Sequence, residues 1–113
     1  MQLIKLITLA AVATATSDQD KCTAKRGGKH AVQAIQALCA KTDMVVPSTY
    51  AQNGHTVSSA HAFISSNCSP AEWVPQYWCL TQFYAMCANN DFIGGSTSQR
   101  YGNGGCQYFE LSK

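Results

Sequence analysis

Six cysteines constrain this chain of 113 residues more than any other feature of its sequence. They are Cys22, Cys39, Cys68, Cys79, Cys87 and Cys106. No two of them form a Cys-x-x-Cys pair, the usual element of a structural zinc site, so we expect neither a metal nor another cofactor. An even number of cysteines in a small exported domain instead predicts a framework of disulfides, here three.

The first residues have the pattern of a secretory signal peptide. Lys5 precedes an apolar run that is too short to span a bilayer, and Ala13-Thr14-Ala15 has the small residues of a cleavage site. We expect a signal peptide at 1–15, cleaved after Ala15 or alternatively after Ala13, and one domain at 16–113. The sequence therefore predicts a secreted, extracellular protein whose cysteines are oxidised.

The charge of the chain argues against nucleic acid as a partner. Of the 8 Lys and Arg residues one lies in the expected signal peptide, which leaves 7 basic residues against 6 acidic ones. Such a domain cannot neutralise many phosphates, and it is not drawn strongly to acidic membranes either.

A polar segment at 16–29 contains Gly27-Gly28 and is expected to be an irregular arm tied down by Cys22. It holds the one basic cluster of the chain, made of Lys21, Lys25, Arg26 and Lys29. Such clusters are usually solvated, but Lys25 and Arg26 are candidates for contact with an anionic surface or a channel mouth.

Residues 30–41 are expected to form the first helix. Val32, Ile35, Leu38 and Cys39 fall on one helical stripe. Apolar residues at this spacing form the buried side of an amphipathic helix, so Cys39 is presented from the buried face.

The segment "CSPAEWVPQYWCLTQFYAMC" at 68–87 is expected to contain the second helix. Ser69 can cap it, Pro70 suits a first helical position, and Glu72 follows Ser69 by three residues, which is a capping box. Because Pro75 clashes with a preceding helical turn, we expect one short turn and then a main helix at about 76–88.

The main helix places Leu80, Phe83, Tyr84 and Cys87 on one apolar face. Its two cysteines, Cys79 and Cys87, point about 80° apart and lie about 12 Å apart along the axis. They cannot pair within one helix, so each requires another partner.

Strands are expected on both sides of an Asn53-Gly54 turn, the first ending at Pro47 and the second within 55–65. Further turns are expected at Gly94-Gly95 and at 102–105, and a final strand at 106–111.

General acid–base catalysis, as in a ribonuclease, has only four plausible residues in this chain. They are His55, His61, Glu72 and Glu110. Their spacing matches no catalytic motif, so we expect no catalytic residues and a protein that is not an enzyme. A small secreted ribonuclease-like enzyme remains the alternative.

Aromatic residues supply the other candidate site. Helical spacing favours a core position for Phe83, whereas Trp73 and Tyr77 lie four residues apart around Pro75 and share a face only if the helix continues through it. Exposed aromatics often mark binding surfaces, so Trp73 and Tyr77 are candidates, for example as a platform for stacking sugars.

Several stretches together resemble a known family. They are "SSNC" at 65–68, the Trp-rich helix start, Cys79, "LTQFYAMC" at 80–87, and a Gly-rich turn with a terminal strand. "VQAIQALCAKTD" at 32–43 lies where the family has an earlier helix ending in a cysteine, and "AHAFISSNC" at 60–68 is similar to its strand before the next cysteine. In spacing and hydrophobicity, over roughly 22–111, the chain resembles the KP4-type killer toxins and KP4-like secreted proteins of fungi.

The resemblance implies an α+β fold, a small disulfide-stapled α/β sandwich in which two helices pack on one face of an antiparallel sheet. It also implies a pairing of the cysteines: Cys22 with Cys87, Cys39 with Cys79, and Cys68 with Cys106. The sequence alone leaves every pairing open.

The resemblance further implies a monomeric, non-enzymatic toxin or effector that acts on another cell, antifungal or host-directed, by binding a membrane protein or cell-wall component. Killer toxins of this type are thought to block calcium uptake through basic surface residues. They carry more cysteines than this chain, whose residues 48–61 also contain no Cys, Lys or Arg. Interference with a cation channel is therefore one implied mode within the broader role, and a glycan-binding effector module is a further alternative.

Overall fold

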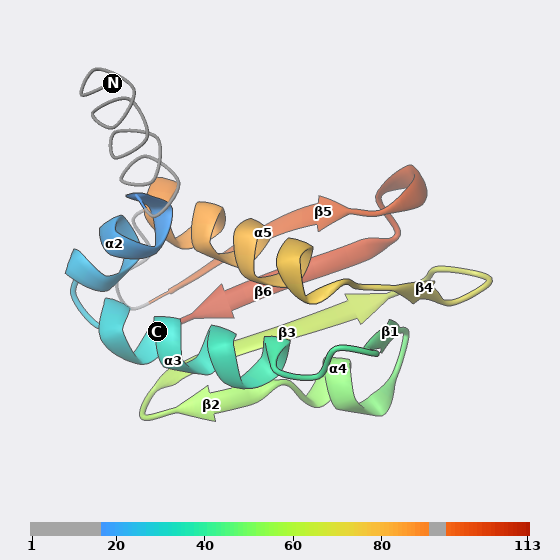
Figure 1. Ribbon diagram of the computed structural model, residues 1–113, viewed down its shortest axis with the longest axis horizontal. Coiled ribbons are helices and arrows are strands. Elements are labelled where there is room, and N and C mark those ends of the chain that lie inside the picture. The colour runs from blue at the N-terminus through green and yellow to red at the C-terminus, as the bar shows by residue number, and fades with distance from the viewer. Residues whose placement is uncertain (1–16, 91–94) are drawn as a thin grey trace, which may run out of the picture.

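The structure of the protein, a computed structural model, describes residues 17–90 and 95–113. The expected signal peptide at 1–15 and Gly94 of the expected Gly94-Gly95 turn lie outside these residues. The described chain has an α+β fold in which helices cover one face of an antiparallel sheet, as predicted (Figure 1).

The sheet has four antiparallel strands in the order β2-β3-β6-β5. Their bounds are His55–Val57 for β2, Ala60–Ser66 for β3, Gln107–Ser112 for β6 and Ser96–Tyr101 for β5. Alternation along β3 and β6 buries Ala62, Ile64, Phe109 and Leu111 on the side of the helices. The opposite face lies towards solvent, because successive side chains of a strand point to opposite faces.

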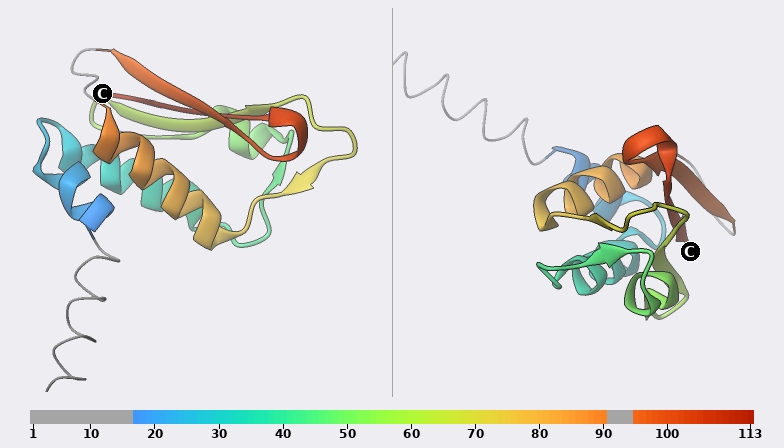
Figure 2. Two further views of the ribbon diagram at one scale, coloured as in Figure 1. Left: turned by 90° about the horizontal axis from the view of Figure 1, so that it is seen from above. Right: turned by 90° about the vertical axis from the view of Figure 1, so that its right-hand side faces the viewer.

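Two long helices, α3 (Gly28–Cys39) and α5 (Gln76–Asn89), pack against the buried face of the sheet, as the view from above shows (Figure 2). The predicted stripe of α3 is confirmed, since Ile35 and Leu38 are fully buried. From α5, Phe83 is fully buried and its ring centroid lies 4.7 Å from that of Phe109 in β6. This contact joins the helical layer to the sheet.

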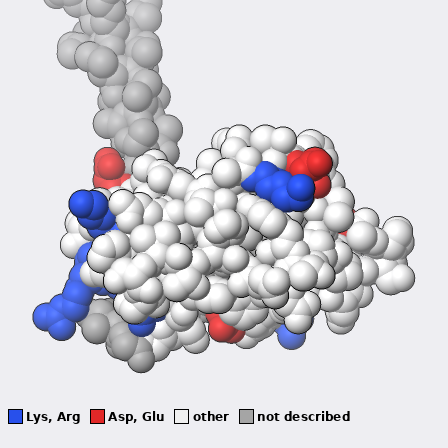
Figure 3. Space-filling model, turned by 90° about the horizontal axis from the view of Figure 1, so that it is seen from below, with Lys and Arg blue, Asp and Glu red and all other residues white. Residues whose placement is uncertain are grey.

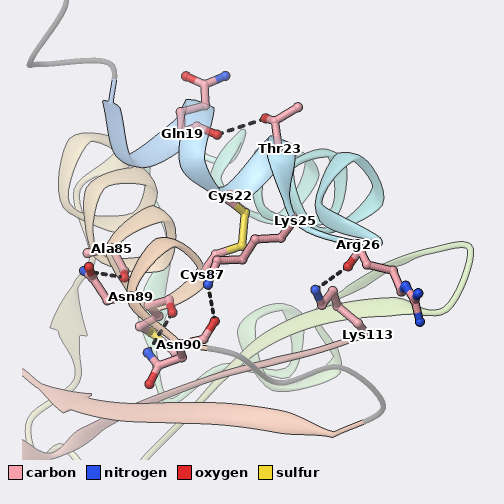
Figure 4. Close-up of a disulfide and its surroundings, with 11 residues drawn as sticks. Gln19, Cys22, Thr23, Lys25, Arg26, Ala85, Cys87, Asn89, Asn90 and Lys113 are labelled. Atoms are coloured by element: carbon pink, nitrogen blue, oxygen red, sulfur yellow. Dashed lines mark hydrogen bonds between the residues drawn. A yellow bond between two sulfur atoms is a disulfide. The ribbon is translucent and has the colours of Figure 1, made fainter.

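Three disulfides connect these elements, with the pairing that the resemblance implied. Cys39–Cys79 joins α3 to α5, and Cys68–Cys106 joins the segment that follows β3 to the residue before β6. Cys22–Cys87 joins the C-terminal part of α5 to the N-terminal segment (Figure 4). Cys79 and Cys87 thus have separate partners, as the helix geometry required.

The expected irregular arm is largely a helix, α2 (Ser17–Ala24). Its residues are polar, with Asp18 and Asp20 in the first turn, so no apolar stripe indicated a helix. The fully buried Cys22 holds α2 against α5, which supplies the tertiary contact that so short a helix needs.

The strand expected to end at Pro47 is present, but it is short, pairs with Glu72–Trp73 rather than across the Asn53-Gly54 turn, and is separated from that turn by a helix. Val45–Val46 forms only the two-residue strand β1, and Thr49–Asn53 forms a short helix, α4. The hydroxyl of Ser48 caps α4 by accepting from the Ala51 N–H at 3.2 Å, and Gly54, with φ of 67°, ends it. The segment after Gly54 is a hairpin of β2 and β3 rather than one strand.

The expected capping box at Ser69 is also wrong. Glu72–Trp73 is a strand, β4, which pairs antiparallel with β1. The Glu72 carboxylate does not return to Ser69 but accepts from the Gln107 side-chain amide at 2.9 Å. Pro75 precedes α5 directly, so the predicted main helix is confirmed and the short first turn is absent.

The glycine-rich turn at 102–105 and the final strand are confirmed, with a 3₁₀ turn at Asn103–Gly105 and β6 beginning at Gln107. The neighbouring strand β5 was not predicted, because the sequence "STSQRY" has little apolar alternation. It forms along the edge of β6 by backbone pairing.

We predict that Cys22–Cys87 is what keeps α2 folded. In a Cys22→Ala/Cys87→Ala variant, backbone amides at 17–24 should exchange with solvent at least about tenfold faster, since an isolated helix of 8 residues is marginal. Amides of α3 should keep their protection. Hydrogen exchange measured by NMR or mass spectrometry provides the readout.

Cys68→Ala/Cys106→Ala serves as the matched control, because it removes a bridge remote from α2. Unchanged protection of 17–24 in the first variant would show that packing alone holds the helix.

Candidate functional site

Four large apolar side chains are exposed in the described residues. They are Val45, Trp73, Tyr77 and Trp78, and we call them the aromatic patch. The three rings are 60%, 67% and 51% exposed respectively. The largest exposed apolar patch of a monomeric protein is often its binding site.

Trp73 is fixed in the patch by long-range hydrogen bonds. It lies in β4 opposite Val45 of β1, and its indole N–H donates to the Thr42 carbonyl at 2.9 Å. The next residue, Val74, is buried, and its N–H donates to the Met44 carbonyl at 2.8 Å. The indole is therefore held with its ring towards solvent.

Tyr77 and Trp78 lie in the first turn of α5, which begins directly after Pro75. Their rings meet edge to face, with centroids 5.0 Å apart. Trp73 and Tyr77 do not share a helical face, because the helix does not continue through Pro75 and Trp73 belongs to strand β4. Trp73 lies instead with Trp78 around one hollow.

This hollow has a volume of about 290 Å³. Its lining consists of Trp73, Val74, Pro75, Trp78, Gln82, Gly102 and Gln107, none of which is charged. The nearby Glu72 carboxylate is held by the Gln107 amide and by the Asn103 N–H, at 2.9 and 3.4 Å. The hollow thus combines two indole rings with the amide side chain of Gln82.

An ion pair lies in the segment before β1. Lys41 Nζ lies 3.1 Å from Asp43 Oδ1, and this hydrogen bond from Lys41 holds the pKa of the Asp43 carboxyl below its ordinary value. The two charges compensate each other, so this pair adds little net charge near Trp73.

The two basic candidates, Lys25 and Arg26, lie away from the aromatic patch. Lys25 donates to the Asn90 carbonyl at 2.5 Å, beyond the last turn of α5, and the Arg26 carbonyl accepts from the Lys113 ammonium group (Figure 4). Tyr77 is at the other end of this helix of 14 residues, which is about 20 Å long. Figure 3 shows several basic side chains at one end of the molecule and others elsewhere on this face, one of them beside acidic side chains. The four candidates therefore form two sites rather than one.

The four catalytic candidates are also separated. His55 is paired with the buried Ala62, so it is on the helix side of the sheet, where its ring contacts that of Tyr50. His61 is on the opposite face, and Glu72 is held in β4. Only His61 and Glu110 share a face, on neighbouring strands.

His61 and Glu110 lack the surroundings that phosphoryl transfer requires. Phe63 is opposite Glu110 and its ring contacts that of His61, whose Nδ1 lies 3.0 Å from Thr56 Oγ1. Arg100, which shares this face, is two strands and four residues from His61, or roughly 15 Å. A single phosphate cannot contact all three groups, so the geometry does not favour a ribonuclease.

One group of potential metal ligands occurs in the described residues, made of Cys68, Glu72 and Cys106, whose ligand atoms lie within 4.8 Å of one another. The two sulfur atoms are bonded to each other, so they are not thiolates and do not form a metal site.

Comparison of the chain with protein-family models, with curated proteins and with solved structures found no match. Within 17–90 and 95–113, no helix combines the length and apolar character needed to cross a bilayer. The site must therefore be interpreted from its own geometry.

We predict that the aromatic patch contributes little to stability. Tyr77→Ala should lower the free energy of unfolding by no more than about 1 kcal/mol, because only an edge contact with Trp78 is lost. Phe83→Ala, in the same helix but fully buried, should lower it by about 3–5 kcal/mol. Denaturant unfolding with the disulfides intact measures both values. Equal losses in the free energy of unfolding for the two variants would mean that the Tyr77 side chain stabilises the fold as a core residue does.

Proposed function

We propose that this protein is a secreted, non-enzymatic toxin or effector of the KP4-like kind, which acts on another cell by binding its surface through the aromatic patch. The observation that carries this proposal is the exposure of Trp73, Tyr77 and Trp78 at one end of the molecule. Aromatic side chains are the most frequent anchors of binding surfaces.

The covalent framework supports the same proposal. Three disulfides are compatible with an extracellular protein, because such bonds persist in oxidising compartments. The fold and the cysteine pairing agree with what the resemblance to KP4-like proteins implies. A fold hosts many functions, so the patch rather than the sandwich carries the functional conclusion.

The basic pair, Lys25 and Arg26, offers a second mode of contact, with an anionic surface or a channel mouth. Lys25 is engaged with the Asn90 carbonyl, and Arg26 is exposed. A pair of cations at a surface contributes mainly to the rate of association, and its contribution falls with salt. We therefore assign affinity to the aromatic patch.

We predict that Tyr77→Ala/Trp78→Ala lowers binding of the fluorescently labelled protein to target cells at least about tenfold. Both side chains lie on one exposed helical turn, so their removal leaves the fold in place. Fungal cells and plant cells are tested in parallel by flow cytometry, with growth inhibition or host response as a second readout.

Lys25→Ala/Arg26→Ala is the matched control, since it changes two surface residues that lie near the C-terminal end of α5, away from Tyr77 and Trp78. A loss of binding confined to this control would transfer the function to the basic pair. Binding by both variants at the wild-type level would refute a role for either surface.

We predict that the protein does not cleave RNA. Purified protein incubated with total RNA should leave it intact, and His61→Ala/Glu110→Gln should keep full activity towards cells. The reason is that Arg100, the cation described on this sheet face, is directed to the Gly105 carbonyl and the Tyr108 ring rather than towards His61. RNA cleavage lost in this variant, but retained in His55→Ala on the opposite sheet face, would establish the ribonuclease alternative.

A further inference from the structure

We propose that the ligand of the aromatic patch is a neutral glycan, a chain of uncharged hexose or N-acetylhexosamine rings such as a cell wall presents, with one ring seated between Trp73 and Trp78. This inference rests on the proposed function, because it names the chemistry that the same surface recognises.

The first argument comes from the chemistry of the hollow. A pyranose ring has faces rich in C–H groups and a rim of hydroxyls, so its site needs an aromatic face together with amide or carbonyl groups. The hollow supplies the rings of Trp73 and Trp78 and the side chain of Gln82, which is partly exposed and can both donate and accept. Its volume, about 290 Å³, lies just below the range for drug-sized ligand sites, about 300–1,000 Å³, which suits a single sugar ring.

The second argument comes from charge. No residue that lines the hollow is charged, and the carboxylate of Glu72 is already bonded to Gln107 and to the Asn103 N–H. The Lys41–Asp43 pair is self-compensated. A phosphate, a uronic acid or an acidic peptide would find no unpaired cation among these groups, whereas an uncharged polyhydroxylated ligand needs none.

The third argument comes from rigidity. The hydrogen bond from the Trp73 indole to Thr42 and the pairing of β4 with β1 fix this ring before any ligand arrives. A preformed stacking surface avoids the cost of ordering side chains on binding, about 0.5–1.5 kcal/mol for each side chain immobilised. Weak contacts with a sugar ring can then give measurable affinity.

The same hydrogen bond argues against a lipid bilayer as the ligand. At a membrane interface the indole N–H faces the wet side, where it bonds to headgroups or water. Here the Trp73 N–H is directed into the protein, so this indole has no free polar end to place among headgroups.

The size of the patch argues against a second copy of the chain. Taking about 200 Å² for a whole aromatic side chain, the three exposed rings present roughly 350 Å² to solvent. A stable protein interface buries about 800 Å² on each partner. The area suits a short stretch of glycan better than a dimer.

Intrinsic fluorescence gives a direct test, because the two tryptophans of the chain both line the hollow. The purified full chain is titrated with hexasaccharides of N-acetylglucosamine, of β-1,3-glucose and of β-1,4-glucose, and with an oligogalacturonate as the charged counterpart. We expect saturable binding of at least one neutral hexasaccharide and none of the oligogalacturonate.

Variants assign the binding to the hollow. Trp78→Ala should weaken the affinity for the neutral hexasaccharide at least about tenfold, and Gln82→Ala about threefold to tenfold. Lys25→Ala/Arg26→Ala should leave it unchanged. Trp73→Phe keeps a stacking ring while removing the indole N–H, so it should retain more affinity than Trp73→Ala. Titration calorimetry confirms the order of affinities for variants that lack one tryptophan.

The outcomes separate this inference from the proposed function. If no neutral hexasaccharide binds, while Tyr77→Ala/Trp78→Ala still reduces binding to cells, the glycan is wrong and the patch retains its role. Patch-dependent binding to phosphatidylcholine vesicles, or patch-dependent dimers in analytical ultracentrifugation, without glycan binding would likewise overturn the inference. If hexasaccharides bind at the hollow but cells bind the variant normally, the proposed function fails and the glycan site stands.

Discussion

Helix α5 is the element on which the rest of this structure depends, because two disulfides and one buried ring fix it. Cys79 bonds to α3, Cys87 bonds to α2, and Phe83 packs against Phe109 of the sheet. The two bridges close loops of 65 and 40 residues, and each stabilises the fold by about 4 kcal/mol in the loop-entropy account. A domain of this size buries only a modest core, so these bonds matter to its net stability.

Periodicity predicted the parts of the fold whose cause is local. The stripe containing Ile35 and Leu38 indicated α3, and the face containing Phe83 indicated α5, since an amphipathic helix buries the side that its own sequence marks. The eight-residue spacing of Cys79 and Cys87 excluded a bond between them for the same local reason. The pairing itself required the resemblance, because spacing alone cannot choose partners.

The elements that the sequence did not predict are those held by distant contacts. The capping pattern at Ser69 was overridden because Glu72 bonds to Gln107, 35 residues away, and Trp73 pairs with β1. The polar α2 has no apolar stripe and depends on Cys22. The edge strand β5 takes its conformation from β6. No local pattern in the sequence indicates these long-range contacts.

The candidate site was predictable in composition but not in shape. Trp73 and Tyr77 could be selected as large aromatics near a proline, yet their exposure follows from Pro75, which separates strand β4 from α5. The side of α5 that faces the core carries Cys79 and Phe83, and its first turn carries Tyr77 and Trp78 towards solvent. The buried side of α5 holds the helix in the fold, so the residues of its exposed first turn can change without loss of the fold. Within α5, the residues that stabilise the fold and those that we propose bind a ligand therefore lie on opposite faces.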